Sequence, residues 1–189
     1  MATELKFCGM RREADILAAN ACLPDYIGFV FAAGARRAVT PETARELRAK
    51  ANPRILAVGV FADQSPAYIA DVAAKVPLDV IQLHGSESET VVEEIRRRTG
   101  KKVWRAFQVT APAVLTAAAE TGADGILLDS GKGSGKTFAW EWLRDFSRPY
   151  MLAGGLDIEN VGEAIKTLSP RGVDVSSALE TDGQKDPEK

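Results

Sequence analysis

Short apolar segments recur along the whole chain at regular distances. Each has about five or six residues rich in Val, Ile, Leu or aromatic residues, a length and composition typical of buried strands. Their first residues are 21 to 29 positions apart, which leaves room for one helix and two loops between consecutive strands. The eight segments are Leu5–Gly9, Tyr26–Phe31, Ile55–Phe61, Val80–His84, Val103–Phe107, Gly125–Asp129, Tyr150–Gly155 and Val173–Ser177.

The stretches between these segments carry the signals of amphipathic helices. Thr40 and Ser65 are candidate N-caps, and each is followed by Pro at the first helical position. Ser86–Glu89 fits the S-x-x-E capping box, and Asp157–Asn160 precedes another stretch with apolar residues at helical spacing. Because strands and helices alternate without a hairpin signal, the pattern favours parallel strands joined by helical crossovers.

Eight strand–helix units predict an α/β fold, a closed (β/α)8 TIM barrel that forms a single domain over residues 1–189. An open doubly wound sheet is the alternative, although such sheets usually have fewer strands. Only nine residues follow Glu180, and they include Gly183 and Pro187, so we expect the eighth helix to be short or absent. An exposed apolar groove should then lie between the first and seventh helices.

Composition narrows the class of protein. The 24 Lys and Arg residues against 26 Asp and Glu give a net charge of −2, which lacks the basic surplus typical of nucleic-acid binding. No apolar run approaches the about 18 residues of a membrane span, and the start shows no secretory signal. The two cysteines, without a Cys/His cluster at zinc spacing, favour a cytoplasmic protein with reduced thiols and no metal.

Polar residues stand where several predicted strands end, the place where (β/α)8 barrels carry their active sites. Asp129 follows an apolar strand, so its carboxyl must be paired or solvated by a cleft; it can be a general acid or a cap of the next loop. Cys8 can be an inert buried thiol, or a base if a nearby cation such as Lys6 assists its ionisation. His84, the single histidine, can be catalytic or structural.

Two pairs of small residues follow the last two predicted strands, Gly154-Gly155 and Ser176-Ser177. The loops after strands seven and eight of such barrels frequently hold a phosphate group through backbone N–H groups. Glycine lets the backbone approach a ligand closely, and serine adds hydroxyl donors. The pairs therefore predict a phosphate site, with ordinary turn formation as the alternative.

Two other loops carry candidate binding residues. Arg36 and Arg37 follow the second strand and can either hold a carboxylate by two parallel hydrogen bonds or remain solvated. Ser130–Thr137 (SGKGSGKT) is close to the nucleotide-binding P-loop, but Ser stands at the first Gly position and no obvious helix follows directly. A glycine-rich loop that covers the barrel mouth is the preferred interpretation.

Together these motifs resemble the phosphoribosylanthranilate isomerases of tryptophan biosynthesis, in the right order from about residue 5 to Lys189. The family usually has Gly-Val after the two serines, whereas this chain has Ala178-Leu179, which puts the phosphate loop in question. The matching segments are Lys6–Gly9 (KFCG), Gly28–Phe31 (GFVF), Arg37–Pro41 (RAVTP), Val58–Phe61 (VGVF), Gln82–Gly85 (QLHG), Leu127–Ser130 (LLDS), Gly135–Phe138 (GKTF), Leu152–Leu156 (LAGGL) and Gly172–Ser177 (GVDVSS).

The resemblance implies an aldose–ketose isomerase that needs no cofactor and acts on a phosphorylated small molecule, as a monomer or homodimer. The implied reaction is the Amadori rearrangement of N-(5-phosphoribosyl)anthranilate to 1-(2-carboxyphenylamino)-1-deoxyribulose 5-phosphate. The resemblance makes Cys8 the general base at ribose C2 and Asp129 the general acid at the ring oxygen. A catalytically silent or differently specific phosphate-binding barrel is the alternative.

The resemblance also implies the residues that bind the two ends of the substrate. Arg37 matches the arginine that holds the anthranilate carboxylate. The residues expected at the phosphate are Gly154, Gly155, Ser176 and Ser177. Lys6, His84 and Asp174 are expected to support the site.

Overall fold

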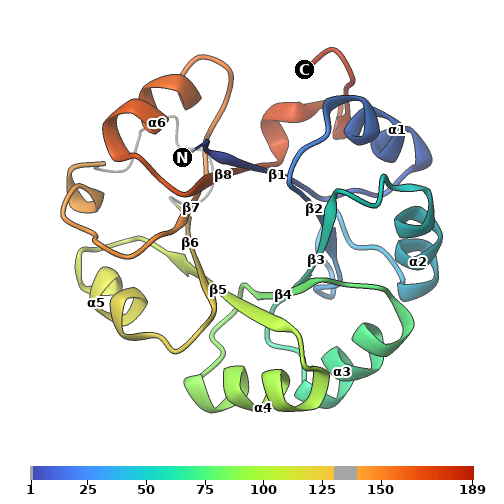
Figure 1. Ribbon diagram of the computed structural model, residues 1–189, viewed down its shortest axis with the longest axis horizontal. Coiled ribbons are helices and arrows are strands. Elements are labelled where there is room, and N and C mark those ends of the chain that lie inside the picture. The colour runs from blue at the N-terminus through green and yellow to red at the C-terminus, as the bar shows by residue number, and fades with distance from the viewer. Residues whose placement is uncertain (1, 130–139) are drawn as a thin grey trace.

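Eight parallel strands close into a barrel in the computed structural model, which describes residues 2–129 and 140–189. Figure 1 looks down the barrel, with the strands in chain order around the ring and β1 beside β8. The closed barrel predicted from the sequence is confirmed, and the open doubly wound sheet is wrong. The strands are β1 (Glu4–Cys8), β2 (Tyr26–Val30), β3 (Leu56–Phe61), β4 (Val80–Leu83), β5 (Lys102–Gln108), β6 (Gly125–Asp129), β7 (Met151–Ala153) and β8 (Gly172–Val175).

Helices surround the barrel (Figure 1). Among the described residues, α-helices follow the first five strands and β7, while a 3-10 helix, η1 (Trp140–Leu143), is the helical element between β6 and β7. The glycine-rich segment Ser130–Thr137 and the matching motif at 135–138 lie outside the described residues. The α-helices are α1 (Glu13–Cys22), α2 (Pro41–Lys50), α3 (Pro66–Lys75), α4 (Glu89–Thr99), α5 (Ala113–Glu120) and α6 (Val161–Leu168).

Local capping follows the sequence at two helices and departs from it at a third. The Thr40 and Ser65 side chains accept hydrogen bonds from backbone N–H groups at the starts of α2 and α3, as predicted. The capping box expected at Ser86–Glu89 is wrong, because Ser88 is the N-cap and Glu89 the first residue of α4. Ser86 instead donates both its N–H and its hydroxyl to the Asp63 carboxylate, at 2.7 and 2.8 Å, so a long-range contact takes the residue out of the cap.

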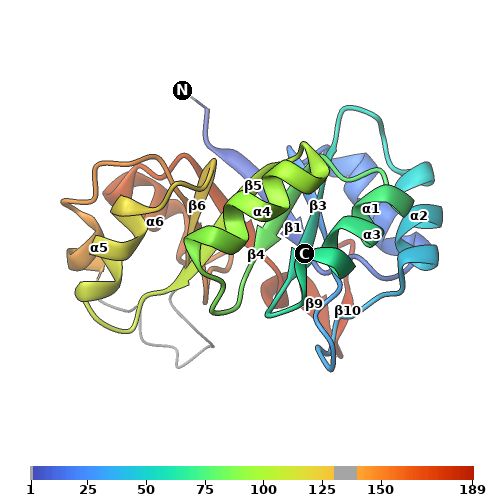
Figure 2. The same ribbon diagram turned by 90° about the horizontal axis from the view of Figure 1, so that it is seen from below.

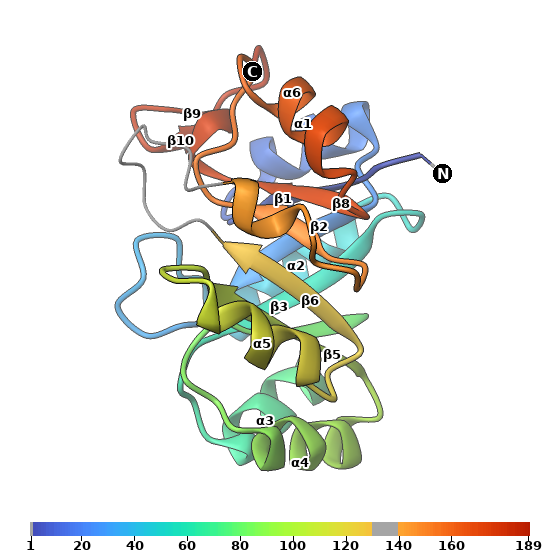
Figure 3. The same ribbon diagram turned by 90° about the vertical axis from the view of Figure 1, so that its left-hand side faces the viewer.

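No eighth α-helix follows β8 in the part of the chain that the structure describes, in agreement with the expectation that it is short or absent. A 3-10 turn, η2 (Ser177–Leu179), leads into a hairpin of β9 (Glu180–Thr181) and β10 (Gln184–Lys185). Figure 3 shows this hairpin at the opposite end of the barrel from the N-terminus, and Figure 2 shows it beside the loop that follows β2. The C-terminal hairpin therefore lies at the carboxyl ends of the strands.

The groove was expected between the first and seventh helices, which are the helices after β1 and β7, here α1 and α6. It is largely filled on the side of α1. Leu179, Lys185, Asp186, Pro187 and Lys189 line this side together with residues of α1 and leave a cavity of only about 60 Å³. On the other side, Ile165 and Leu168 of α6 are half-buried and pack against the barrel core. The C-terminal residues thus cover much of the surface that a helix covers elsewhere around the barrel.

The barrel strands pack apolar side chains on both faces, as parallel strands between two layers require. In β3, Val58 and Val60 belong to the cluster inside the barrel, whereas Ala57 and Phe61 belong to the cluster under the helices. Gly59 faces the helices, because a Cβ built on it would lie 2.5 Å from Leu78 Cδ1 and 2.9 Å from Phe61 Cε2. Because Gly59 has no side chain, Leu78 and Phe61 can pack directly against its backbone.

Gly59→Ala should destabilise the fold by about 1–3 kcal/mol, because the added methyl group overpacks a site whose neighbours Leu78 and Phe61 are fully buried. The change is measured as a lower free energy of unfolding in urea. Gly162→Ala is the control, since nothing lies within 4 Å of its Cβ position in α6 and alanine favours helix by up to about 1 kcal/mol. Equal stability of Gly59→Ala and wild type would contradict the tight packing.

Candidate active site

A cavity of about 680 Å³ opens at the carboxyl end of the barrel. Its walls come from strand ends and loops on several sides of the ring, including the loops after β2, β7 and β8. It therefore brings together residues that are far apart in the sequence. The predicted site residues that line it are Cys8, Arg37, His84, Gly154, Gly155, Asp174, Ser176 and Ser177.

Asp129 ends β6 and contacts the cavity wall through the single histidine. Its Oδ2 lies 3.3 Å from His84 Nε2, and the other ring nitrogen of His84 lies 3.3 Å from Gln82 Nε2. The side chains of Asp129 and His84 are 21% and 35% exposed. Asp129 is thus both paired and in contact with solvent, which satisfies the requirement stated for a carboxyl at this place.

Cys8 ends β1 beside a buried ion pair. The Lys6 ammonium is fully buried and lies 3.0 and 2.9 Å from the two carboxylate oxygens of Asp174. A Cβ on Gly28, the partner of Cys8 in β2, would lie 3.0 Å from Cys8 Sγ and 3.3 Å from Lys6 Nζ. Glycine at this position therefore leaves the room in which the thiol and the ammonium group lie next to each other.

Burial raises the pKa of the Cys8 thiol above its ordinary value. The positive charges of Lys6 and Lys185 oppose this effect, and the negative charge of Asp174 adds to it. Lys6 therefore acts in the direction expected from the sequence, but its charge is shared with Asp174 and does not outweigh burial. This upward shift of the pKa favours the protonated thiol at neutral pH.

The two loops expected to bind phosphate differ in how they present their groups. Gly154 and Gly155 both have positive φ, 86° and 61°, so the loop after β7 uses a backbone conformation that favours glycine. Ser176 donates its hydroxyl to the backbone carbonyl of Cys8 at 3.0 Å, while Ser177 is exposed at the start of η2. Ala178 lies within η2 and is not among the positive-φ residues of the described chain, so alanine causes no backbone strain there.

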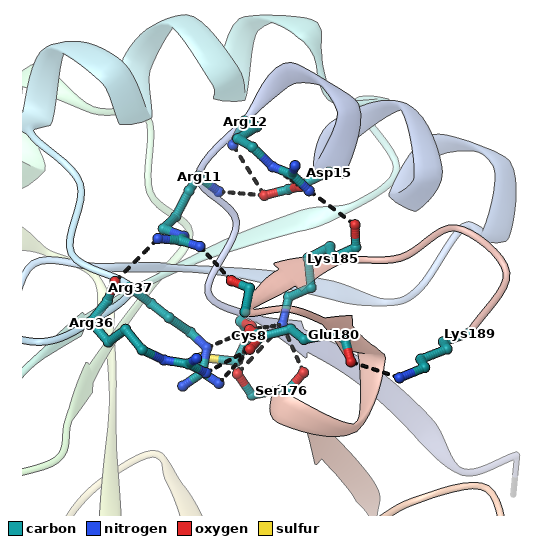
Figure 4. A network of polar contacts seen from close by, with 11 residues as sticks. Cys8, Arg11, Arg12, Asp15, Arg36, Arg37, Ser176, Glu180, Lys185 and Lys189 are labelled. Carbon is teal, nitrogen blue, oxygen red and sulfur yellow. Dashed lines mark hydrogen bonds and ion pairs between the residues drawn. The ribbon is translucent and has the colours of Figure 1, made fainter.

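Glu180, which the sequence did not indicate, binds the arginine expected to hold the substrate carboxylate. Its Oε1 lies 2.5 Å from Arg37 Nε and its Oε2 lies 2.9 Å from Arg37 Nη2. Arg36 Nη2 also contacts Oε2, at 2.7 Å, and Lys185 Nζ contacts Oε1, at 3.1 Å (Figure 4). Burial opposes ionisation, but these cationic hydrogen bonds prevail and lower the pKa of Glu180 to about 2.

Lys185, the second residue that sequence reasoning missed, connects the hairpin to the loop after β8. Its side chain is 6% exposed, and its ammonium group donates to the backbone carbonyl of Ser176 at 2.8 Å. Arg11 and Arg12 hold the hairpin from the start of α1 through the backbone carbonyls of Gly183 and Lys185 (Figure 4). The C-terminal hairpin is therefore a fixed part of the cavity rim.

Across residues 2–129 and 140–189, no group of three or more His, Cys, Asp or Glu side chains is arranged to hold a metal ion. None of the helices that the structure describes has the length and apolar character needed to cross a membrane.

Comparisons with known proteins agree with this geometry. The family model of N-(5'-phosphoribosyl)anthranilate isomerase matches residues 5–189. The chain belongs to this family. The resemblance noted from the sequence motifs is thereby confirmed. Among its relatives, the N-(5'-phosphoribosyl)anthranilate isomerase of Paracoccus denitrificans is 42% identical over 202 residues, which cover 100% of this chain and 94% of the relative.

Solved structures of the isomerase family share the fold. The crystal structure of phosphoribosyl anthranilate isomerase from Thermotoga maritima has a TM-score of 0.90 and 36% identity, and the match covers 99% of this chain and 94% of the other. A phosphoribosyl anthranilate isomerase in complex with reduced 1-(o-carboxyphenylamino)-1-deoxyribulose 5-phosphate has a TM-score of 0.87 and 35% identity, with the same coverage. That relative binds a phosphorylated small molecule.

Glu180→Gln should lower the free energy of unfolding at neutral pH, and the deficit should shrink in acid. The pKa of Glu180 is about 2 in the fold, against an ordinary value of 4.5, so the ionised carboxylate stabilises the native state fully above about pH 5. That stabilisation is lost as the pH falls towards 2. Urea unfolding of both proteins between pH 7 and pH 3 measures the difference, and a deficit that does not change with pH would contradict the ion-pair network.

Proposed function

We propose that this chain converts N-(5-phosphoribosyl)anthranilate to 1-(2-carboxyphenylamino)-1-deoxyribulose 5-phosphate in tryptophan biosynthesis, with Cys8 as general base and Asp129 as general acid. Membership of the isomerase family supports the reaction. The observation that supports the assignment of roles is that one cavity is lined by Cys8, Arg37 and the loops after β7 and β8, with Asp129 paired to His84 of its wall.

The first step opens the furanose ring. Asp129 donates a proton to the ring oxygen, the bond between this oxygen and C1 breaks, and the nitrogen lone pair forms a C1=N Schiff base. His84, which lines the cavity, contacts the Asp129 carboxyl at 3.3 Å and restrains its position. The partial exposure of this pair gives it access to solvent protons between turnovers.

The second step moves a proton within the opened sugar. The Schiff base acidifies the hydrogen on C2, and the Cys8 thiolate removes it to give an enaminol. Protonation at C1 and loss of the proton from the C2 hydroxyl then give the ketone, so substrate and product have the same atoms. No redox partner is needed for this balance.

The two ends of the substrate are held by different loops of the rim. Arg37 binds the anthranilate carboxylate through two parallel hydrogen bonds. Gly154, Gly155, Ser176 and Ser177 bind the phosphate through backbone N–H groups and the exposed Ser177 hydroxyl. With both ends anchored, the sugar lies between the acid and the base, which lowers the entropic cost of reaching the transition state.

Cys8→Ser and Asp129→Asn should each lower kcat by roughly 10²–10⁴-fold, because each removes one proton-transfer group. The labile substrate is generated in situ, and the loss of its anthranilate fluorescence gives the rate. Cys22→Ser and Asp71→Asn are matched controls on exposed positions of α1 and α3 and should keep wild-type rates.

Near-normal turnover in both active-site variants would end the proposed mechanism. A wild-type chain that binds the phosphorylated product but does not turn the substrate over would instead favour the catalytically silent barrel.

The activity should rise with pH through and above the ordinary thiol range of about 8.5, because burial raises the pKa of Cys8 and only its thiolate acts as the base. Lys185→Met removes a positive charge that stabilises the thiolate, so the rising limb of kcat/KM should move to higher pH. Lys166→Met, on an exposed position of α6, should leave the limb in place. A profile that is flat from pH 7 to pH 9.5 in wild type would argue against a Cys8 base.

A further inference from the structure

The Arg37 guanidinium offers only one of its two edges to Glu180. The Nε and Nη2 atoms form the pair with the carboxylate, while Nη1 has no hydrogen-bond partner among residues 2–129 and 140–189. We propose that Glu180 is a positioning residue, which holds the Nε edge of Arg37 so that the Nη1–Nη2 edge meets the substrate carboxylate. This inference rests on the proposed function, since it takes Arg37 as the carboxylate anchor.

The stem of Arg37 is constrained together with its head. A Cβ on Gly9 would lie 2.4 Å from Arg37 Cδ, so the aliphatic part of the side chain lies directly on the backbone that follows Cys8. Gly9 has a φ of 88°, and its lack of a side chain creates this contact surface. With the stem on Gly9 and one edge on Glu180, the guanidinium plane has a fixed direction next to the thiol.

The charges around Glu180 allow Arg37 to bind the substrate carboxylate while it stays paired with Glu180, so the substrate does not have to displace the glutamate. Arg36, Arg37 and Lys185 place three cationic groups within 3.1 Å of one carboxylate. A surplus of positive charge therefore remains when Glu180 is paired. The Glu180 side chain is only 5% exposed, so the substrate meets Arg37 and not the glutamate.

Glu180 is itself held by residues outside the carboxylate anchor. Lys185 binds both Glu180 and the backbone carbonyl of Ser176, and Arg11 binds Gly183 in the turn of the hairpin. The hairpin therefore links Arg37, through Glu180 and Lys185, to the loop after β8 that carries Ser176. Figure 4 shows this network around Glu180, with Cys8 among the residues next to it.

The test compares two probes that differ only in the carboxylate that Arg37 would bind. One is reduced 1-(o-carboxyphenylamino)-1-deoxyribulose 5-phosphate, and the other is its phenylamino counterpart without the carboxyl group. Their Kd values are measured by calorimetry for wild type, Glu180→Gln and Glu180→Asp. KM and kcat for the substrate and for its carboxyl-free analogue, made from aniline, are measured alongside.

We expect Glu180→Gln to raise the Kd of the carboxylated probe and the KM of the substrate by about tenfold each, a fold-change equal to about 1.4 kcal/mol. The kcat of the variant should stay within about twofold of wild type. The carboxyl-free probe should bind the variant and wild type equally. Glu180→Asp keeps the charge on a shorter side chain and should give a smaller loss. Glu163→Gln, an exposed glutamate of α6, is the control and should change nothing.

Three results would overturn the inference. Tighter binding of the carboxylated probe by Glu180→Gln would make Glu180 a competitor of the substrate. An equal rise in Kd for both probes would show that Glu180 has only a structural role. A folded Glu180→Gln variant with unchanged Kd for both probes would show that Glu180 has no role in binding. Failure of the proposed function is distinguishable, because a folded wild type would then not turn over the substrate, whatever the Kd values of the Glu180 variants. A folded wild type that also failed to bind the carboxylated probe would overturn both proposals.

Discussion

The ion pair between Lys6 and Asp174 is the interaction on which the rest of the site depends. These residues are register partners in β1 and β8, the two strands that close the barrel. Their charges lie inside the barrel, where a single unpaired charge would cost several kcal/mol, and removal of one partner of such a pair typically costs about 3–5 kcal/mol. The pair therefore favours one register of the closing strands over any other.

This closure determines the chemistry above it. Side chains alternate between the two faces of β1, so Lys6 and Cys8 lie on the same face. The thiol and the buried ammonium group are therefore neighbours. Burial raises the pKa of the Cys8 thiol, the ammonium group of Lys6 opposes this shift, and the carboxylate of Asp174 adds to it. Under the proposed mechanism, the upward shift of the Cys8 pKa keeps the thiolate fraction low, which limits reactions of the thiolate when no substrate is present.

The sequence predicted the barrel and most of the proposed site because both follow from local patterns. Strand ends converge in any closed parallel barrel, so Cys8, His84 and Asp129 could be placed near the mouth before their contacts were known. Ser86 was misassigned because its partner, Asp63, lies 23 residues away on another loop. Periodicity carries no information on such a contact.

Glu180 and Lys185 could not be predicted for a related reason. They lie in a short polar stretch without apolar periodicity, which gives no sign that it folds back over the barrel mouth. Four arginines and a lysine carry the interaction: Arg11, Arg12, Arg36, Arg37 and Lys185 are all solvated in the unfolded chain and meet only when the barrel has closed. The C-terminal hairpin therefore forms only on a closed barrel. The position of Arg37 at the cavity rim in turn depends on the hairpin. Loss of the hairpin contacts should accordingly weaken carboxylate binding before it affects the barrel, because the Lys6–Asp174 seam and the strand ladder do not pass through residues 180–189.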